Sequence, residues 1–124
     1  MALSIGEVAE IAGVATSTLR YYEDIGLINP PQRLNGRRQY AEDVLPILAI
    51  IQLAKDSQFT LDEIKELLYD FPADVPISDR WQIIAERKIL EIELVIQQAQ
   101  ETKALLQDSM ICEYLHTELD DALD

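Results

Sequence analysis

Cysteine, histidine and glycine are all scarce in this chain of 124 residues, which has one, one and four of them. The single cysteine, Cys112, excludes a disulfide within the chain and a metal site built from several cysteines of one chain. The single histidine is His116, and the four glycines do not form a phosphate-binding loop. Because no nucleophile stands beside a base with an orienting group, we expect a protein that is not an enzyme. The sequence itself requires no cofactor, and whether the protein binds one stays open.

Long apolar runs are missing as well. No stretch approaches the ~20 consecutive apolar residues that a membrane span needs, and no long apolar run follows a basic start at the amino terminus. We therefore expect a cytoplasmic protein with no membrane partner. Since single domains commonly run to ~100–150 residues, the chain has room for one domain and a smaller attached segment.

Basic residues are outnumbered, with 10 Lys and Arg against 23 Asp and Glu and a net charge of −13. The imbalance is uneven: residues 1–58 hold 5 basic and 7 acidic residues, whereas the remaining 66 residues hold 5 basic and 16 acidic ones. Within residues 16–40 the count is 4 basic against 2 acidic. DNA binding depends on Lys and Arg displacing counterions, so any DNA contact is expected in that segment.

The first residues have the pattern of a short helix that ends in a tight turn. Ser4 and Glu7 have the spacing of a capping box, in which each side chain bonds the other residue's backbone amide. Gly13 then supplies the backbone freedom that a sharp turn requires.

A second helix is expected from about Thr16. Ala15, Leu19 and Tyr22 fall at intervals of four and three, which predicts a shared face packed on the first helix. The residues that project elsewhere, where they can touch phosphates or bases, are Ser17, Arg20, Tyr21 and Asp24.

A basic hairpin follows this pair of helices. Asn35-Gly36 is the dipeptide that a type I′ turn prefers, because both of its residues need positive φ. Three arginines close to this turn, in a chain that is otherwise strongly acidic, favour a DNA-contacting wing over a merely solvated loop. The wing residues are Arg33, Arg37, Arg38 and Tyr40.

These segments together resemble the amino-terminal domain of MerR-type transcriptional regulators. The most specific part is the run Thr18-Leu19-Arg20-Tyr21-Tyr22-Glu23, placed after a Gly-Val turn and before an Asn-Gly wing. The likeness covers about the first 70 residues by motif, and the rest only by a long helix. The other matching segments are Ile5-Gly6-Glu7-Val8-Ala9, Gly13-Val14, Gly26-Leu27-Ile28, Asn35-Gly36-Arg37-Arg38-Gln39-Tyr40 and Gln58-Phe59-Thr60-Leu61-Asp62-Glu63-Ile64-Lys65-Glu66-Leu67-Leu68.

The resemblance implies a sequence-specific DNA-binding regulator and assigns residues of the second helix. Arg20 and Tyr21 match the positions that contact phosphates and the groove. Thr16 and Ser17 lie at the start of that helix and are expected nearest to the bases.

The wing assignments also follow from the resemblance. Arg33, Arg38 and Tyr40 match wing positions that hold the neighbouring DNA backbone, whereas Arg37 stands where the family usually has an aromatic residue. Ala15 replaces the usual hydroxyl cap of the second helix, at a cost of about 1 kcal/mol.

A long helix is expected from Ser78, as its cap, to about Met110, with a length of about 50 Å. A compact monomer of this size cannot bury such a length, so we expect a homodimer; the alternative is a helix folded against its own domain. The resemblance implies an antiparallel coiled coil here. The a/d seam comprises Ala85, Ile89, Ile92, Ile96, Ala99, Lys103 and Leu106.

The predicted fold is therefore mainly α, with a winged helix-turn-helix DNA-binding domain and a long dimerisation helix. The expected boundaries are 1–72 for the DNA-binding domain, 73–77 for a linker, 78–110 for the dimerisation helix and 111–124 for a short acidic tail. Two identical units would recognise an inverted-repeat operator. The resemblance further implies control of transcription by DNA distortion, with RNA polymerase at the promoter.

The acidic tail holds candidate effector ligands. Cys112 and His116 are four residues apart, so on a helix they would share a face and form half of an intersubunit metal site. The alternative is that Cys112 is a small packing residue.

Two other functions stay open at the level of sequence. One is an architectural or excisionase-like winged-helix accessory protein, which a monomeric state would favour. The other is an acidic coiled-coil module for protein interaction, which strong partner binding without DNA affinity would favour.

Overall fold

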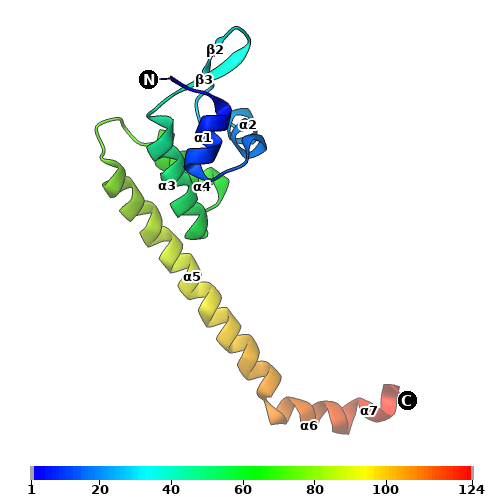
Figure 1. Cartoon of the computed structure of the whole chain (residues 1–124). Helices are drawn as coiled ribbons and strands as arrows, with labels where there is room; N and C mark the ends of the chain where they lie inside the picture. Colours follow the sequence, from blue (N-terminus) through cyan, green and yellow to red (C-terminus); the bar gives the residue numbers. More distant parts are fainter. Residues whose placement is uncertain (1, 124) are drawn as a thin grey trace. The chain divides into compact units, whose positions relative to one another are not determined.

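The computed structural model describes residues 2–123, except for the side chain of Asp121. These residues form seven helices and three short strands (Figure 1). Two compact units are present, the first ending at Ile84 and the second beginning at Ala85. The fold is mainly α, as predicted. The elements are β1 (Ala2–Leu3), α1 (Ile5–Ala12), α2 (Thr16–Asp24), β2 (Gln32–Leu34), β3 (Arg37–Ala41), α3 (Val44–Asp56), α4 (Leu61–Tyr69), α5 (Ile77–Gln107), α6 (Ser109–Glu118) and α7 (Asp120–Leu123).

The capping box that begins α1 is confirmed. The Glu7 amide donates to Ser4 Oγ at 3.1 Å, and the Ser4 amide donates to Glu7 Oε1 at 3.0 Å. Gly13 takes a φ of 70°, in the left-handed region that the turn into α2 requires. The predicted helix-turn-helix is therefore held by local signals at both ends of α1.

The start of α2 at Thr16 is confirmed, but the packing predicted for Ala15 is wrong. Leu19 and Tyr22 are buried, whereas Ala15 is exposed. Ala15 occupies the N-cap position, where the backbone is extended. A residue there does not follow the periodicity of the helix it precedes.

The wing is a two-residue hairpin, as predicted. Asn35 and Gly36 have φ values of 52° and 78°, and strands β2 and β3 pair antiparallel on either side of them. The sheet order is β1-β3-β2, with Leu3 opposite Tyr40. The amino-terminal strand thus pairs with the wing, an arrangement that the sequence analysis did not predict.

The core of the first unit lies between α1, α2, α3 and α4. Tyr69, near the end of α4, donates its hydroxyl to the Leu27 carbonyl at 2.6 Å, which fixes the segment that follows α2. Pro46 is tolerated because it lies in the first turn of α3, where its missing amide costs no helical bond. The fully buried residues include Val8, Leu19, Leu27, Ile28, Ile51, Ile64, Leu67 and Ile84.

The predicted limits of the long helix are wrong at both ends. The Pro76 carbonyl accepts the Asp79 and Arg80 amides at 3.1 Å each, so α5 begins at Ile77 and contains Ser78 within its first turn. At the other end, Asp108 accepts the Met110 amide at 2.9 Å and caps a separate helix, α6. Asp108 is a strong N-cap residue, which explains the break after Gln107.

In the second unit, the predicted acidic tail contains most of helix α6 and all of helix α7. Throughout residues 2–123, each helix is too short or too polar to span a bilayer.

Candidate nucleic-acid interface

The outer face of α2 is a polar and aromatic surface. Ser17, Arg20 and Tyr21 are exposed, with 51% of Tyr21 accessible to solvent, and Thr16 is half-buried in the first turn. The opposite face is buried in the core. The four residues that we assigned to the second helix therefore all lie on α2, and their contact with DNA stays a prediction.

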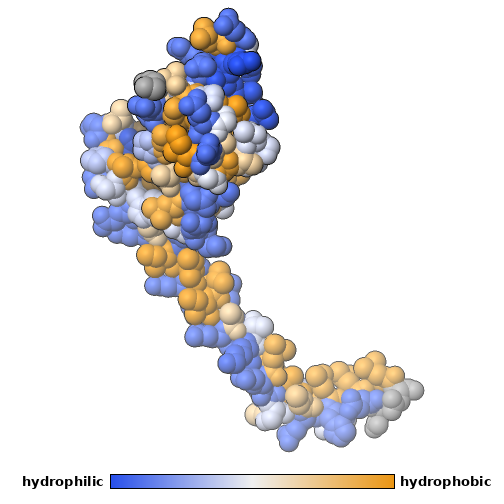
Figure 2. Space-filling view, viewed as in Figure 1, coloured by the Kyte–Doolittle hydropathy of each residue, from blue (hydrophilic) through white to orange (hydrophobic). Residues whose placement is uncertain are grey.

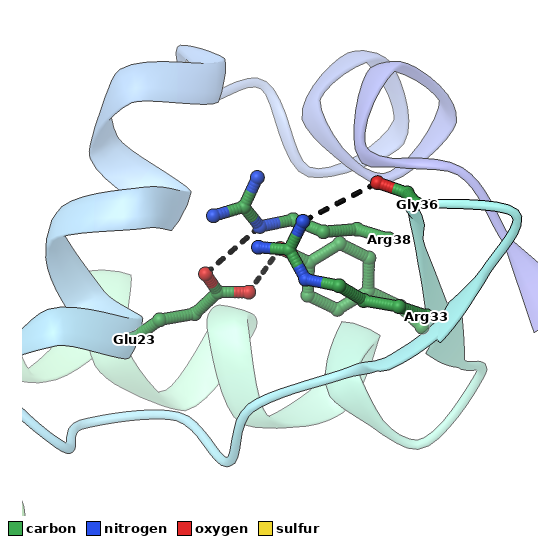
Figure 3. A network of polar contacts seen from close by, with 5 residues as sticks. Glu23, Arg33, Gly36 and Arg38 are labelled. Carbon is green, nitrogen blue, oxygen red and sulfur yellow. Dashed lines mark hydrogen bonds and ion pairs between the residues drawn. The ribbon is translucent and has the colours of Figure 1, made fainter.

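Arg33 and Arg37 form the exposed basic part of the wing. One Arg33 guanidinium nitrogen, Nη1, donates to the Gly36 carbonyl at 3.3 Å (Figure 3). This bond ties the Arg33 side chain to the turn. Leu34, next to the turn on β2, is 63% exposed, so the hairpin tip presents both charge and an apolar side chain.

A polar network joins the end of α2 to the wing. Arg38 Nε donates to Glu23 Oε2 at 3.0 Å (Figure 3). The Tyr40 hydroxyl donates to Glu23 Oε1 at 2.6 Å. The Glu23 and Arg38 side chains are only 9% and 21% exposed. A charge-assisted pair with so little solvent is stronger than an exposed salt bridge, so the network holds the wing against the recognition helix.

The prediction that Tyr40 contacts DNA is wrong. Tyr40 is 2% exposed, and its hydroxyl is bonded to Glu23. Burial, followed by the hydrogen bond to Glu23, raises the pKa of Tyr40 well above its usual value, so the hydroxyl stays protonated and remains a donor. Tyr40 supports the wing from inside, and Arg38, half-buried beside it, shares that task.

The role of Glu23 was not predicted from the sequence. A usable signal was present, because Arg38 and Tyr40 are two residues apart on one strand and therefore face the same side. A basic and a hydroxyl side chain on that side predict a shared acceptor. Which carboxylate supplies it depends on how α2 packs against β3, and that is a tertiary property.

An open cavity of about 640 Å³ lies beside the outer face of α2. Lys55, at the end of α3, donates to the Tyr22 hydroxyl at 3.3 Å, and its ammonium lies 5.8 Å from the centre of that ring. Lys55 is thus a cation next to the recognition helix that the sequence analysis missed, since 33 residues separate it from Tyr22. The cavity is lined by Ser17, Thr18, Tyr21, Tyr22, Lys55, Gln58, Phe59, Thr60 and Leu61.

The candidate effector residues lie on α6. Cys112 is a free, exposed thiol, and His116 Nδ1 lies 2.5 Å from Asp120 Oδ2. Among the residues that the structure describes, no three His, Cys, Asp or Glu side chains come together as a metal site.

A recognition helix, a basic wing and a network that joins them define a winged helix-turn-helix DNA-binding protein. The family model described as MerR HTH family regulatory protein matches residues 3–70, and the model described as MerR, DNA binding matches residues 45–108. The chain belongs to the MerR family and is a DNA-binding transcriptional regulator.

Individual proteins agree with this assignment. The chain is 34% identical over 105 residues to the HTH-type transcriptional regulator HmrR of Rhizobium leguminosarum bv. viciae, covering 85% of this chain and 81% of HmrR. It resembles the lead(II) complex of PbrR691 from Ralstonia metallidurans CH34, with 29% identity and a TM-score of 0.69 over 86% of this chain and 83% of that one. The EcmrR–DNA complex in EcmrR-RPo gives 28% identity and a TM-score of 0.61 over 94% of this chain and 40% of that one.

Proposed function

We propose that the chain acts as a homodimer, paired through α5, that recognises an inverted-repeat operator. The observation that carries this proposal is a row of exposed apolar side chains on α5. Ile89, Ile92 and Ile96 are 52%, 42% and 50% accessible to solvent, and Leu106 is 79% accessible. Hydrophobic residues are prominent along α5 in Figure 2. Such a row needs a partner, and its a/d spacing suits a second copy of the same helix.

The two alanines of the seam fit the same pairing, whereas Lys103 weakens its far end. Ala85 is half-buried and Ala99 is exposed, and both are small enough to let two helices approach closely. We propose an antiparallel pair on the strength of the family resemblance. The exposed seam favours this dimeric regulator over the monomeric accessory protein that the sequence alone left open.

We assign DNA contact to the exposed residues of α2 and of the wing tip. Arg20 and Tyr21 would contact backbone and groove, with Ser17 and Thr16 nearest the bases, while Arg33 and Arg37 would hold the neighbouring phosphates. Arg38 acts mainly by holding the wing. A two-fold dimer presents these residues twice, and this duplication is why the operator is expected to be an inverted repeat.

Regulation by DNA distortion is the mechanism we propose for control of transcription, with RNA polymerase as a partner at the promoter. EcmrR, a structural relative, is bound to DNA within EcmrR-RPo. Distortion of a site of this kind costs of order 1–6 kcal/mol, which contacts from two units would offset. This step is tested by relaxing closed circular operator DNA while the protein is bound and then measuring its linking number, which untwisting would change. An unchanged linking number would show that the protein binds without untwisting the DNA.

A regulator of promoters acts where the chromosome is, so we place the protein in the bacterial cytoplasm. We assign it no enzymatic activity. Cys112 and His116 remain candidate effector ligands, and they would be completed by the partner chain of the dimer.

Arg20→Ala is expected to weaken operator binding about tenfold at moderate salt, because a dimer loses one phosphate contact on each half-site. The dependence of log affinity on log salt should also become shallower by about two, one for each copy. Fluorescence anisotropy across a salt series measures both quantities. Arg87→Ala, which removes an arginine from α5 instead, is the matched control. An Arg20→Ala protein with the affinity and the salt slope of that control would reject Arg20 as a contact.

A further inference from the structure

Arg80, in the first turn of α5, is bonded to four main-chain carbonyl groups of the first unit. Its Nε donates to the Val75 carbonyl at 2.9 Å, and its Nη2 donates to the Pro72 carbonyl at 3.3 Å. Its Nη1 donates to the carbonyls of Leu67 and Leu68 at 3.3 Å and 3.1 Å. An arginine has five N–H donors, so most of them are used here.

The four carbonyls belong to two separate pieces of chain. Leu67 and Leu68 lie in the last turn of α4, where carbonyls have no partner within the helix. That turn contains no basic residue of its own, so Arg80 supplies from α5 the cation that a helix carboxyl end favours. The other two carbonyls lie in the connection between α4 and α5. Arg80 therefore joins the end of α4, this connection and the start of α5.

Two neighbours secure the same stretch of α5. The Trp81 ring stacks on Phe59, with ring centroids 4.9 Å apart, and Ile84 is fully buried. Phe59 lies immediately before α4, beside the cavity at the recognition helix. From Ala85 to Asp120, by contrast, no residue is buried. The anchored part of α5 thus ends where its exposed seam begins.

We propose that Arg80 is a positioning residue that couples the dimer seam to the DNA-binding unit, and that it thereby sets which half-site spacing the dimer accepts. The inference rests on the dimeric operator recognition proposed above. The physical reason is that one continuous helix, α5, joins the first unit to the seam. It runs from Ile77 to Gln107, and the boundary between the two units falls within it, after Ile84. The Arg80 bonds, together with the Trp81–Phe59 stack and the buried Ile84, hold the start of α5 on the first unit and so resist a twist between that unit and the seam.

The spacing of the half-sites is a direct probe of this coupling. Each base pair added between them moves one half-site by about 3.4 Å and turns it by about 35° around the duplex. A dimer with firmly held units can follow such a change only by distorting the DNA. A dimer whose DNA-binding units pivot at the start of α5 can adjust to the new spacing with little loss of affinity.

The experiment compares wild type and Arg80→Lys on duplexes that carry identical half-sites with spacers shortened or lengthened one base pair at a time. Wild type is expected to lose about tenfold in affinity for each base pair away from the best spacer. Arg80→Lys retains the charge, but a single ammonium cannot reach four carbonyls as a planar guanidinium does. Its affinity should vary by less than about threefold over the same series, with unchanged binding to an isolated half-site.

The outcomes are separable. Arg87→Lys should keep the sharp wild-type profile, and it is the matched control because it makes the same change of arginine to lysine at another position of α5. If the affinity of Arg80→Lys depends on spacer length as sharply as that of the wild type, this inference is wrong but the dimer proposal stands. If the affinity of the wild type does not depend on the spacing or symmetry of the half-sites, both this inference and the dimer proposal are wrong. Trp81 fluorescence during urea unfolding shows whether the variant is folded. If Arg80→Lys does not fold, Arg80→Gln replaces it under the same criterion.

Discussion

Ile92→Asp is expected to convert the protein into a monomer in solution and to abolish binding to a complete operator. Ile92 lies in the middle of the α5 seam and is 42% exposed in the single chain, so a partner would bury it. Each seam position occurs twice in a symmetric dimer. An uncompensated buried charge costs about 3–5 kcal/mol, and two of them would raise the dissociation constant of the dimer by more than roughly 10⁴.

Sedimentation velocity at micromolar concentration measures this effect. Gln98→Asp is the matched control, because it adds the same charge to an exposed position of α5 that lies away from the a/d seam. The control should sediment as wild type does. If Ile92→Asp also sediments with the wild-type coefficient, α5 does not form the dimer interface.

Glu23→Ala is expected to lower operator affinity about tenfold or more, equivalent to at least ~1.4 kcal/mol. The substitution leaves Arg38 Nε and the Tyr40 hydroxyl without their acceptor at a site that is largely closed to solvent. The loss of these charge-assisted bonds should cost about 3 kcal/mol of folding free energy and release the wing from α2.

Asp24→Ala separates this effect from simple electrostatics. Glu23 and Asp24 are adjacent acids, and removal of either one lowers the repulsion of DNA by one charge. Charge alone therefore predicts tighter binding for both variants. The network predicts opposite results, with weaker binding for Glu23→Ala and equal or tighter binding for Asp24→Ala. Equal affinities in an anisotropy titration, with both variants folded by Trp81 fluorescence, would show that the wing does not depend on Glu23.

Local signals in the sequence were enough for the helix-turn-helix and the wing. The Ser4–Glu7 box and the Asn35-Gly36 turn act over two or three residues, and their geometry has few alternatives. The exposed face of α2 followed from helical periodicity. The elements that carry the proposed DNA surface could therefore be predicted before any tertiary contact was known.

The interactions that position this surface could not be predicted in the same way. The Glu23 carboxylate meets Tyr40 across 17 residues, and Arg80 reaches Leu67 across 13. Such pairs depend on how elements pack, which periodicity does not contain. The family resemblance placed Tyr40 on the DNA side, whereas burial places it in the core.

The break after α5 is a different case, because a local signal was present and was overlooked. Asp108 has the residue type of an N-cap, but the apolar pattern continues past it into Met110 and Ile111. The pattern therefore extended the predicted helix too far. The cap decides the boundary, because it satisfies a free amide of the next helix.

We propose that two copies of this chain recognise one two-fold-symmetric operator. Selection of binding sites from a random duplex DNA pool, with the purified full chain at moderate salt, tests it most directly. We expect the recovered sequences to share an inverted repeat with a fixed spacer between its halves. Recovery of a single unrepeated half-site, at the affinity of the full pool, would contradict the dimeric account and leave a monomeric winged-helix protein in its place.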